Sequence, residues 1–186
     1  GRVKALYACP EFFEYARISG NALFIPRGMK DRLIAYLLIR GLEYALEDKT
    51  ISSPIDVKGQ KSPVLRDYQE KLINDLLAGE EGLIEASLGS GKTIIGLEIL
   101  RRLSQKSVIL VSRKQLLMQW VSECEQFYGH RIGQVCAGKT DIQDITVCTW
   151  QSLPKVIEKL KGAGCVLIDE AQEVVAEKRE KLLKCF

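Results

Sequence analysis

From residue 64 to the end of the chain, two patterns of hydrophobic and polar positions alternate regularly. Short apolar runs alternate with longer stretches in which apolar residues recur every three to four positions, the patterns of buried strands and amphipathic helices. Such alternation predicts an α/β fold with a parallel β-sheet flanked by helices. We expect strands over 82–86, 107–111, 132–136, 145–149 and 165–168, and helices over 67–77, 92–103, 114–126, 153–160 and from about 175.

The first 55 residues carry a shorter pattern. Residues 21–26 predict a strand stopped by proline, residues 29–39 show helical spacing ended by a glycine, and residues 42–46 predict a second strand. This part is therefore expected to be a small β-α-β unit. Residues 52–63 have the Ser, Pro, Gly and Lys content of a linker. We divide the chain into a small α+β domain over 1–55, a linker over 56–63 and an α/β domain over 64–186.

Composition supports a folded protein without a membrane segment. A chain of 186 residues with 46% hydrophobic and 27% charged residues is not collagen-like, low in complexity or disordered. Its longest uncharged apolar helical run is far shorter than the roughly 20 residues that span a bilayer. The N-terminus lacks Met and the apolar segment of a signal peptide, so the chain reads as a piece of a longer protein. We expect an intracellular protein with no membrane partner, in the cytoplasm or nucleoid, or in the nucleus if the source is eukaryotic.

Charge and cysteine content narrow the chemistry further. The net charge of +3 is too small to indicate nucleic-acid binding by itself. The six cysteines stand singly, and the one histidine, His130, lies in a predicted loop. This pattern argues against a zinc site or a dense disulfide scaffold. We expect reduced thiols, of which those in apolar runs are buried as small hydrophobic groups: Cys136, Cys148 and Cys165.

A glycine-rich segment connects the predicted strand 82–86 to the predicted helix 92–103. It consists of Ala86, Ser87, Leu88, Gly89, Ser90, Gly91, Lys92 and Thr93. Glycines at these positions let successive backbone N–H groups point at phosphate oxygens, and the helix N-terminus adds a positive dipole end. Lys92 is placed to bridge the β- and γ-phosphates, and the Thr93 hydroxyl is placed to bind Mg²⁺. The segment predicts a nucleoside-triphosphate site.

Two carboxylates, Asp169 and Glu170, directly follow the apolar run 165–168. Ligands of parallel sheets bind at the carboxyl ends of the strands, so the acidic pair and the glycine-rich segment are expected to face one cavity. There Asp169 would hold Mg²⁺, and Glu170 would orient and deprotonate the water that attacks the γ-phosphate. Alone, the pair would be typical of a solvated strand end; beside Lys92 it predicts a catalytic site.

A third segment, residues 65–69, opens the predicted helix 67–77. The Gln69 amide can donate and accept, which complements the amino group and N7 edge of adenine, and Arg66 is placed to stack on the base. In isolation, an exposed arginine and glutamine at a helix start would be the better interpretation.

Together these segments resemble the motifs of superfamily 2 helicases and translocases over residues 64–175. Residues 65–69 resemble the Q motif, and residues 86–93 and 168–172 resemble motifs I and II. Further likenesses cover 111–120, similar to motif Ia, and 146–153, similar to the next nucleic-acid-contacting motif. The Q-motif form and the Gln119-Trp120 pair favour the branch of repair translocases, phage recombination helicases and type III restriction motor subunits.

The resemblance implies a RecA-like P-loop NTPase domain that uses ATP and Mg²⁺ and grips one strand of nucleic acid, with DNA as the expected partner. It implies that Gln172, where family members usually carry His or Asp, couples the nucleotide site to the rest of the motor. Strand contacts are implied for Ser112, Arg113, Thr149, Trp150 and Gln151. Burial is the alternative for Trp150, and Trp120 is expected in the core. The domain over 1–55 resembles the small, possibly DNA-contacting, domain that precedes the motor.

Family members hydrolyse ATP between two RecA-like domains, whereas this chain ends soon after Gln172. We therefore expect the N-terminal part of an ATP-dependent DNA helicase or translocase, truncated within its first motor domain. By itself it should bind nucleotide weakly and hydrolyse it slowly, because a second RecA-like domain is needed. Three alternatives stay open: the motor subunit of a type III restriction-like nuclease, a P-loop phosphotransferase, and a non-catalytic nucleic-acid-binding module.

Overall fold

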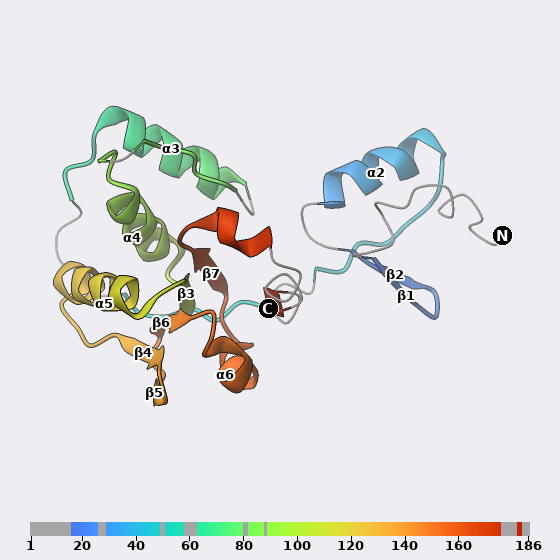
Figure 1. Cartoon of the computed structure of the whole chain (residues 1–186). Coiled ribbons are helices and arrows are strands. Elements are labelled where there is room, and N and C mark those ends of the chain that lie inside the picture. Colours follow the sequence, from blue (N-terminus) through green and yellow to red (C-terminus); the bar gives the residue numbers. More distant parts are fainter. Residues whose placement is uncertain are drawn as a thin grey trace. The chain divides into compact units, whose positions relative to one another are not determined.

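The structure is a computed structural model of the chain. It describes residues 16–25, 29–48, 51–57, 63–79, 82–87, 89–175 and 182–183. The chain divides into two compact units, Gly1–Asp48 and Lys49–Phe186 (Figure 1).

Within its described residues, the first unit contains a hairpin and one helix. Strand β1 (Arg17–Ser19) pairs with β2 (Ala22–Phe24) in antiparallel orientation, and helix α2 (Lys30–Ile39) follows. Gly20, at φ +58°, makes the tight turn that lets β2 pair with the residues directly before it. The β-α-β prediction was therefore wrong. Residues 42–46 form no strand and are exposed, and the partner of β2 is β1, which precedes it in the sequence.

The second unit contains a five-stranded sheet of order β5-β4-β6-β3-β7. Its four parallel strands are β4 (Gly133–Cys136), β6 (Ile145–Thr149), β3 (Ser107–Val111) and β7 (Cys165–Ile168). Strand β5 (Lys139–Asp141) adds an antiparallel edge that the sequence pattern did not predict. Ala137 and Gly138, both at positive φ, form the two-residue turn between β4 and β5.

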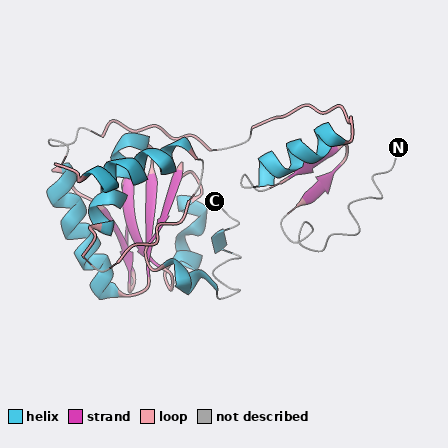
Figure 2. Ribbon diagram, turned by 90° about the horizontal axis from the view of Figure 1, so that it is seen from above, coloured by secondary structure: helices cyan, strands magenta, loops and turns pink. Residues whose placement is uncertain are grey.

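Helices cover both faces of this sheet (Figure 2). Helices α4 (Lys92–Leu103) and α5 (Lys114–Tyr128) pack on one face, and α6 (Leu153–Leu160) packs on the other. Alternate residues of β3 point to opposite faces, so Ile109 lies in the first cluster and Val108 in the second. Helix α3 (Asp67–Ala78) precedes α4, and a 3₁₀ helix, η3 (Ala171–Val175), follows β7. The predicted α/β fold with flanking helices is confirmed.

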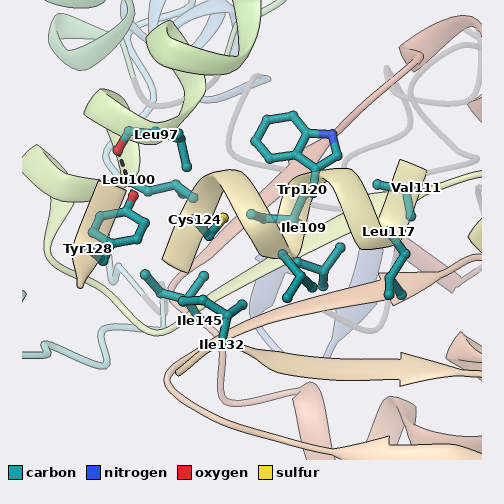
Figure 3. Packing of buried hydrophobic residues seen from close by; sticks show 12 residues of the cluster. Leu97, Leu100, Ile109, Val111, Leu117, Trp120, Cys124, Tyr128, Ile132 and Ile145 are labelled. Carbon is teal, nitrogen blue, oxygen red and sulfur yellow. Dashed lines mark hydrogen bonds between the residues drawn. The ribbon is translucent and has the colours of Figure 1, made fainter. Parts of the chain in front are cut away.

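The larger core cluster lies between α4, α5 and the sheet (Figure 3). The Tyr128 hydroxyl donates to the carbonyl oxygen of Leu97 at 2.7 Å, which joins α5 to α4 inside this cluster. Trp120 is 6% exposed, so the prediction that it lies in the core is confirmed. Cys148 is buried, and Cys136 and Cys165 are half-buried; all three are free thiols.

One further prediction needs correction, and another lies largely outside the described residues. Residues 82–87, expected to include a strand, lie outside the sheet, and Leu83 is 75% exposed. The run carries a glycine and Glu85, which weaken its preference for a buried strand. The helix expected from about 175 falls largely on residues outside those described, and η3 directly precedes it, so this helix stays a prediction.

Residues 53–57 belong to the second unit, whereas the sequence pattern places them at the end of the small domain and the start of the linker. The Ile55 N–H donates to the Ser104 carbonyl at 2.9 Å, and the Lys106 N–H donates to the Ser53 carbonyl at 2.7 Å. Ile55 and Val57 pack against the larger core cluster. The roles assigned to the two domains stay predictions. Within the described ranges, no helix is long and apolar enough to cross a membrane.

Candidate functional site

The glycine-rich loop leads directly into α4. Gly89 and Gly91 have φ values of +78° and +80°, and Gly91 caps the helix with backbone alone, without a side-chain hydrogen bond. The first bond of the helix runs from the Ile95 N–H to the Gly91 carbonyl at 3.1 Å. The preceding N–H groups of the first turn therefore remain for an anion at the positive end of the helix dipole. Leu88, a predicted member of this loop, lies outside the described residues.

Lys92 lies over the loop that precedes it. Its ammonium donates to the carbonyl oxygen of Ala86 at 2.6 Å and to that of Ser87 at 3.4 Å. The side chain is exposed, so the ammonium can exchange these carbonyls for another acceptor. The Ser90 hydroxyl, by contrast, is buried and has no hydrogen-bond partner among the described residues.

The start of α3 braces the same loop. Gln69 is only 6% exposed; its Oε1 accepts from the Arg66 N–H at 2.9 Å and its Nε2 donates to the Ser90 carbonyl at 3.0 Å. The Tyr68 hydroxyl donates to the same carbonyl at 2.7 Å and accepts from Arg66 Nη1 at 3.2 Å. Gln69 thus caps its own helix and holds the loop. The adenine contacts of Arg66 and Gln69 stay predictions.

An ion-pair network around the buried Glu98 fixes α3 against α4. Glu98 is fully buried on α4, and its carboxylate accepts from Arg101 and Arg102, each at 2.7 Å. Arg102 also donates to Glu70 at 2.7 Å and to Asn74 at 2.9 Å on α3. Burial tends to raise the pKa of Glu98, but the two arginines outweigh it and hold the pKa below its ordinary value. The network holds α3, which carries Gln69, against α4.

The predicted acidic pair leaves the carboxyl end of β7. The Asp169 N–H donates to the Leu110 carbonyl at 3.0 Å, and Asp169 Oδ2 accepts from Trp120 Nε1 at 2.8 Å. Glu170 adopts φ +59°, rare for a residue with a side chain, and its carboxylate accepts from Gln172 Nε2. The predicted coupling residue therefore contacts the predicted general base.

Close packing at Gly96 brings the loop helix α4 against the strand that carries Asp169. A Cβ at Gly96 would lie 2.9 Å from Leu167 Cδ1 and 3.3 Å from Trp120 Cη2. Only glycine lets the α4 backbone approach β7 and the indole this closely. Since Gly96 is one turn beyond Lys92, the first turns of α4 adjoin the acidic strand end.

Thr93 and Asp169 suit a magnesium ion that shares its coordination with phosphate and water. No group of three or more His, Cys, Asp or Glu side chains that could hold a metal occurs in the described ranges. Mg²⁺ is usually bound through one or two protein oxygens plus substrate phosphates, so this sparse donor set fits. Asp169 Oδ1 has no hydrogen-bond partner among the described residues, which leaves it for such an ion.

The predicted strand-contacting residues gather at one edge of the sheet. β3 and β6 are paired in parallel with Val111 opposite Thr149, and the Trp150 N–H donates to the Val111 carbonyl at 3.1 Å. Ser112 and Arg113 follow β3, and Gln151 follows β6, at the same carboxyl edge as Asp169. This edge therefore carries residues predicted for nucleic-acid contact and residues predicted for ATP hydrolysis.

The side chains at this edge differ in their exposure to solvent. Trp150 is only 3% exposed, which confirms the buried alternative for it. Thr149 is also buried, and its hydroxyl donates to Ser152 Oγ at 3.0 Å. Arg113 and Gln151 are exposed. The Ser112 hydroxyl is buried without a partner in the part of the chain that the structure describes.

Sequence reasoning missed the link between Trp120 and Asp169. Helical spacing assigned Trp120 to the core, and the acidic pair stood out by its own pattern, but 49 positions separate them. The sequence holds one weak signal for this link: a tryptophan in the core needs an acceptor for its indole N–H.

Comparison with known proteins agrees with the resemblance read from the motifs. The family model described as "Type III restriction enzyme, res subunit" matches residues 62–186. The "Probable helicase D10" of Escherichia phage T5 is 27% identical over 139 residues, which cover 74% of this chain and 30% of that protein. The "DNA 3'-5' translocase XPB2" of Sulfurisphaera tokodaii is 29% identical over 114 residues, 61% of this chain and 26% of that protein.

A solved structure shares the fold. The crystal structure of a hypothetical ATP-dependent RNA helicase from Sulfolobus tokodaii matches with a TM-score of 0.52 at 19% identity. The match covers 85% of this chain and 45% of that chain. The chain spans less than a third of the length of the two sequence relatives.

Proposed function

Because the chain belongs to the type III restriction enzyme res-subunit family within superfamily 2, we propose that it is the first RecA-like motor domain of an ATP-dependent DNA helicase or translocase. One observation carries this assignment: the phosphate-loop helix α4 packs through Gly96 against β7, the strand that ends in Asp169 and Glu170. DNA is proposed as the track because the relatives include a DNA translocase.

In this role the loop and α4 bind the triphosphate. The N–H groups of the first turn of α4 donate to phosphate oxygens, and Lys92 moves its ammonium from the carbonyls of Ala86 and Ser87 to the phosphates. Thr93 and Asp169 would hold Mg²⁺, which when bound neutralises phosphate charge. Gln69 and Tyr68 keep the loop in shape through the Ser90 carbonyl.

Glu170 is proposed as the general base for hydrolysis. Its carboxylate lies one residue beyond Asp169 and is oriented by the hydrogen bond from Gln172. It would align a water molecule with the γ-phosphorus and take its proton. Gln172 cannot ionise, so it would couple Glu170 to the rest of the motor by hydrogen bonding alone.

The carboxyl edge of the sheet would contact the nucleic-acid strand. Arg113 and Gln151 are exposed there and can donate to phosphate oxygens, whereas the Ser112 hydroxyl is buried. Such contacts position the strand without reading its sequence. A second RecA-like domain of the parent protein would complete the ATP site and supply an arginine to the transition state.

The test measures nucleotide binding and ATP turnover of the full-length protein, with and without single-stranded DNA. We expect Lys92→Ala to abolish nucleotide binding, because it removes the cation that faces the phosphates. Lys155→Ala, an exposed lysine on α6, is the matched control and should bind as the wild type does.

Glu170→Gln separates nucleotide binding from ATP hydrolysis in the same two measurements. It should keep nucleotide affinity while turnover falls by about 10²- to 10⁴-fold, the usual contribution of a general base. Unchanged hydrolysis in Glu170→Gln would refute the base assignment. Wild-type turnover that DNA does not stimulate would refute the motor, and transfer of phosphate to a small acceptor would indicate a phosphotransferase.

A further inference from the structure

Trp120 has a role beyond core packing, and the inference rests on the proposed function of the domain as an ATP-dependent motor. We propose that Trp120 is a positioning residue: its indole N–H holds the Asp169 carboxylate in the orientation that lets the other oxygen bind Mg²⁺. The indole Nε1 donates to Asp169 Oδ2 at 2.8 Å, within the short range typical of hydrogen bonds to a carboxylate.

The indole is itself held in place by its surroundings. Trp120 is 6% exposed and belongs to the core cluster between α4, α5 and the sheet (Figure 3). Its ring edge fills the space that the missing side chain of Gly96 leaves on α4, where a Cβ would approach Cη2 to 3.3 Å. Tryptophan is a donor only, so in this position the indole N–H can only donate. The carboxylate therefore keeps one oxygen occupied and one oxygen for a metal.

The same bond joins two parts of the proposed motor. Trp120 belongs to α5, which begins at Lys114, directly after the candidate strand-contacting residues Ser112 and Arg113. Asp169 follows β7, on which α4 packs. One hydrogen bond thus connects the candidate magnesium ligand with the helix that starts at the candidate nucleic-acid edge.

A positioning role differs from a purely structural one in what the loss of the N–H changes. Trp120→Phe keeps an aromatic ring in the core and removes only the donor and part of the ring. Tyr128→Phe is the matched control: it also removes one donor from a buried aromatic residue of the same cluster, but its partner is the Leu97 carbonyl, away from Asp169.

The first experiment measures nucleotide affinity of the full-length protein as a function of Mg²⁺, using a fluorescent ATP analogue. We expect Trp120→Phe to raise the half-saturating Mg²⁺ concentration by about tenfold, the lower end of what loss of an outer-shell partner costs a metal site. Affinity in EDTA should stay at the wild-type value, because the phosphate contacts are untouched. Tyr128→Phe should leave both quantities unchanged.

The second experiment needs neither nucleotide nor metal. In protein labelled with ¹⁵N-tryptophan, the Trp120 indole N–H signal is identified by its loss in Trp120→Phe. Asp169→Asn should move this signal, since it replaces the carboxylate acceptor by a neutral amide, whereas Glu170→Gln should leave it in place.

The outcomes separate this proposal from the proposed function. Wild-type protein that binds no ATP analogue refutes the nucleotide site itself, and the indole signal still reports on the Trp120–Asp169 bond. An analogue that binds with the same Mg²⁺ dependence in wild type and Trp120→Phe overturns the positioning role. So does an equal shift in Tyr128→Phe, or an indole signal that Asp169→Asn does not move.

Discussion

Gly91 and Gly89 offer a matched pair of substitutions in the phosphate loop. Their φ values, +80° and +78°, are nearly equal, so an alanine at either position costs about 1–2 kcal/mol of backbone strain. The surroundings differ. A Cβ at Gly91 would lie 2.7 Å from Gln69 Nε2, whereas nothing lies within 4 Å of a Cβ at Gly89. Only Gly91→Ala therefore displaces the Gln69 amide.

The extra cost of Gly91→Ala follows from the bond that is lost. The displaced amide would give up its 3.0 Å hydrogen bond to the Ser90 carbonyl, worth about 0.5–1.5 kcal/mol. The carbonyl keeps the Tyr68 hydroxyl as a donor, which limits the loss. We expect the free energy of unfolding of Gly91→Ala to lie about 1 kcal/mol below that of Gly89→Ala. At a typical urea slope of about 2 kcal/mol/M, the midpoints would differ by about 0.5 M.

Urea unfolding without nucleotide, followed by tryptophan fluorescence, measures this difference. Both tryptophans, Trp120 and Trp150, lie in the second unit, so the signal reports on the unit that contains the loop. A Gln69→Ala background completes a double-mutant cycle, in which the excess cost of Gly91→Ala should vanish. Equal midpoints of the two alanine variants, or an excess that persists without the Gln69 amide, would show that Gln69 does not brace the loop.

Two further predictions concern buried groups. Arg102→Ala should lower the free energy of unfolding by about 1.5–3 kcal/mol, the range for a hydrogen bond to a charged group, because buried Glu98 then keeps Arg101 alone. Since the folded pKa of Glu98 is lowered, the stability it contributes is present above its ordinary pKa and lost as pH falls. The difference in the free energy of unfolding between wild type and Arg102→Ala, measured in urea, should therefore become smaller in acid. A difference that does not change with pH would contradict the network. Burial raises the pKa of Cys124 and of Cys148 to about 12, so a thiol reagent at pH 8 should modify neither in the folded protein. Their contribution to stability is full below the ordinary value of 9.0 and is lost as pH rises toward 12; rapid labelling at pH 8 would disprove their burial.

Hydrophobic periodicity predicted the helices that bury one face and the strands that are buried on both faces. Helices α4 and α5 and strands β3 and β6 lie within about two residues of their predicted bounds, because most of their apolar residues are buried. The pattern failed where local backbone geometry decided the outcome. The turns at Gly20 and at Ala137-Gly138 created β1 and β5, each too short to show a period of its own.

The candidate site was predictable residue by residue but not as a set of contacts. The loop, the acidic pair and Gln69 each stand at a recognisable place in the sequence, since phosphate binding requires glycines before a helix and acids after a strand. The bonds that orient them come from residues chosen by packing. Trp120 reaches Asp169 only because Gly96 lets α4 approach β7, and neither spacing nor composition reveals that approach.

The contacts of Lys92 explain how the loop can keep its shape and still accept an anion. Its ammonium is satisfied by two neutral carbonyls, of Ala86 and Ser87, and the side chain is exposed. A phosphate oxygen is a stronger acceptor, because hydrogen bonds between charged groups are roughly twice as strong as neutral ones. Release of Lys92 toward a triphosphate is therefore favourable. The loop does not depend on Lys92 alone, since Gln69 and Tyr68 hold the Ser90 carbonyl from the side of α3.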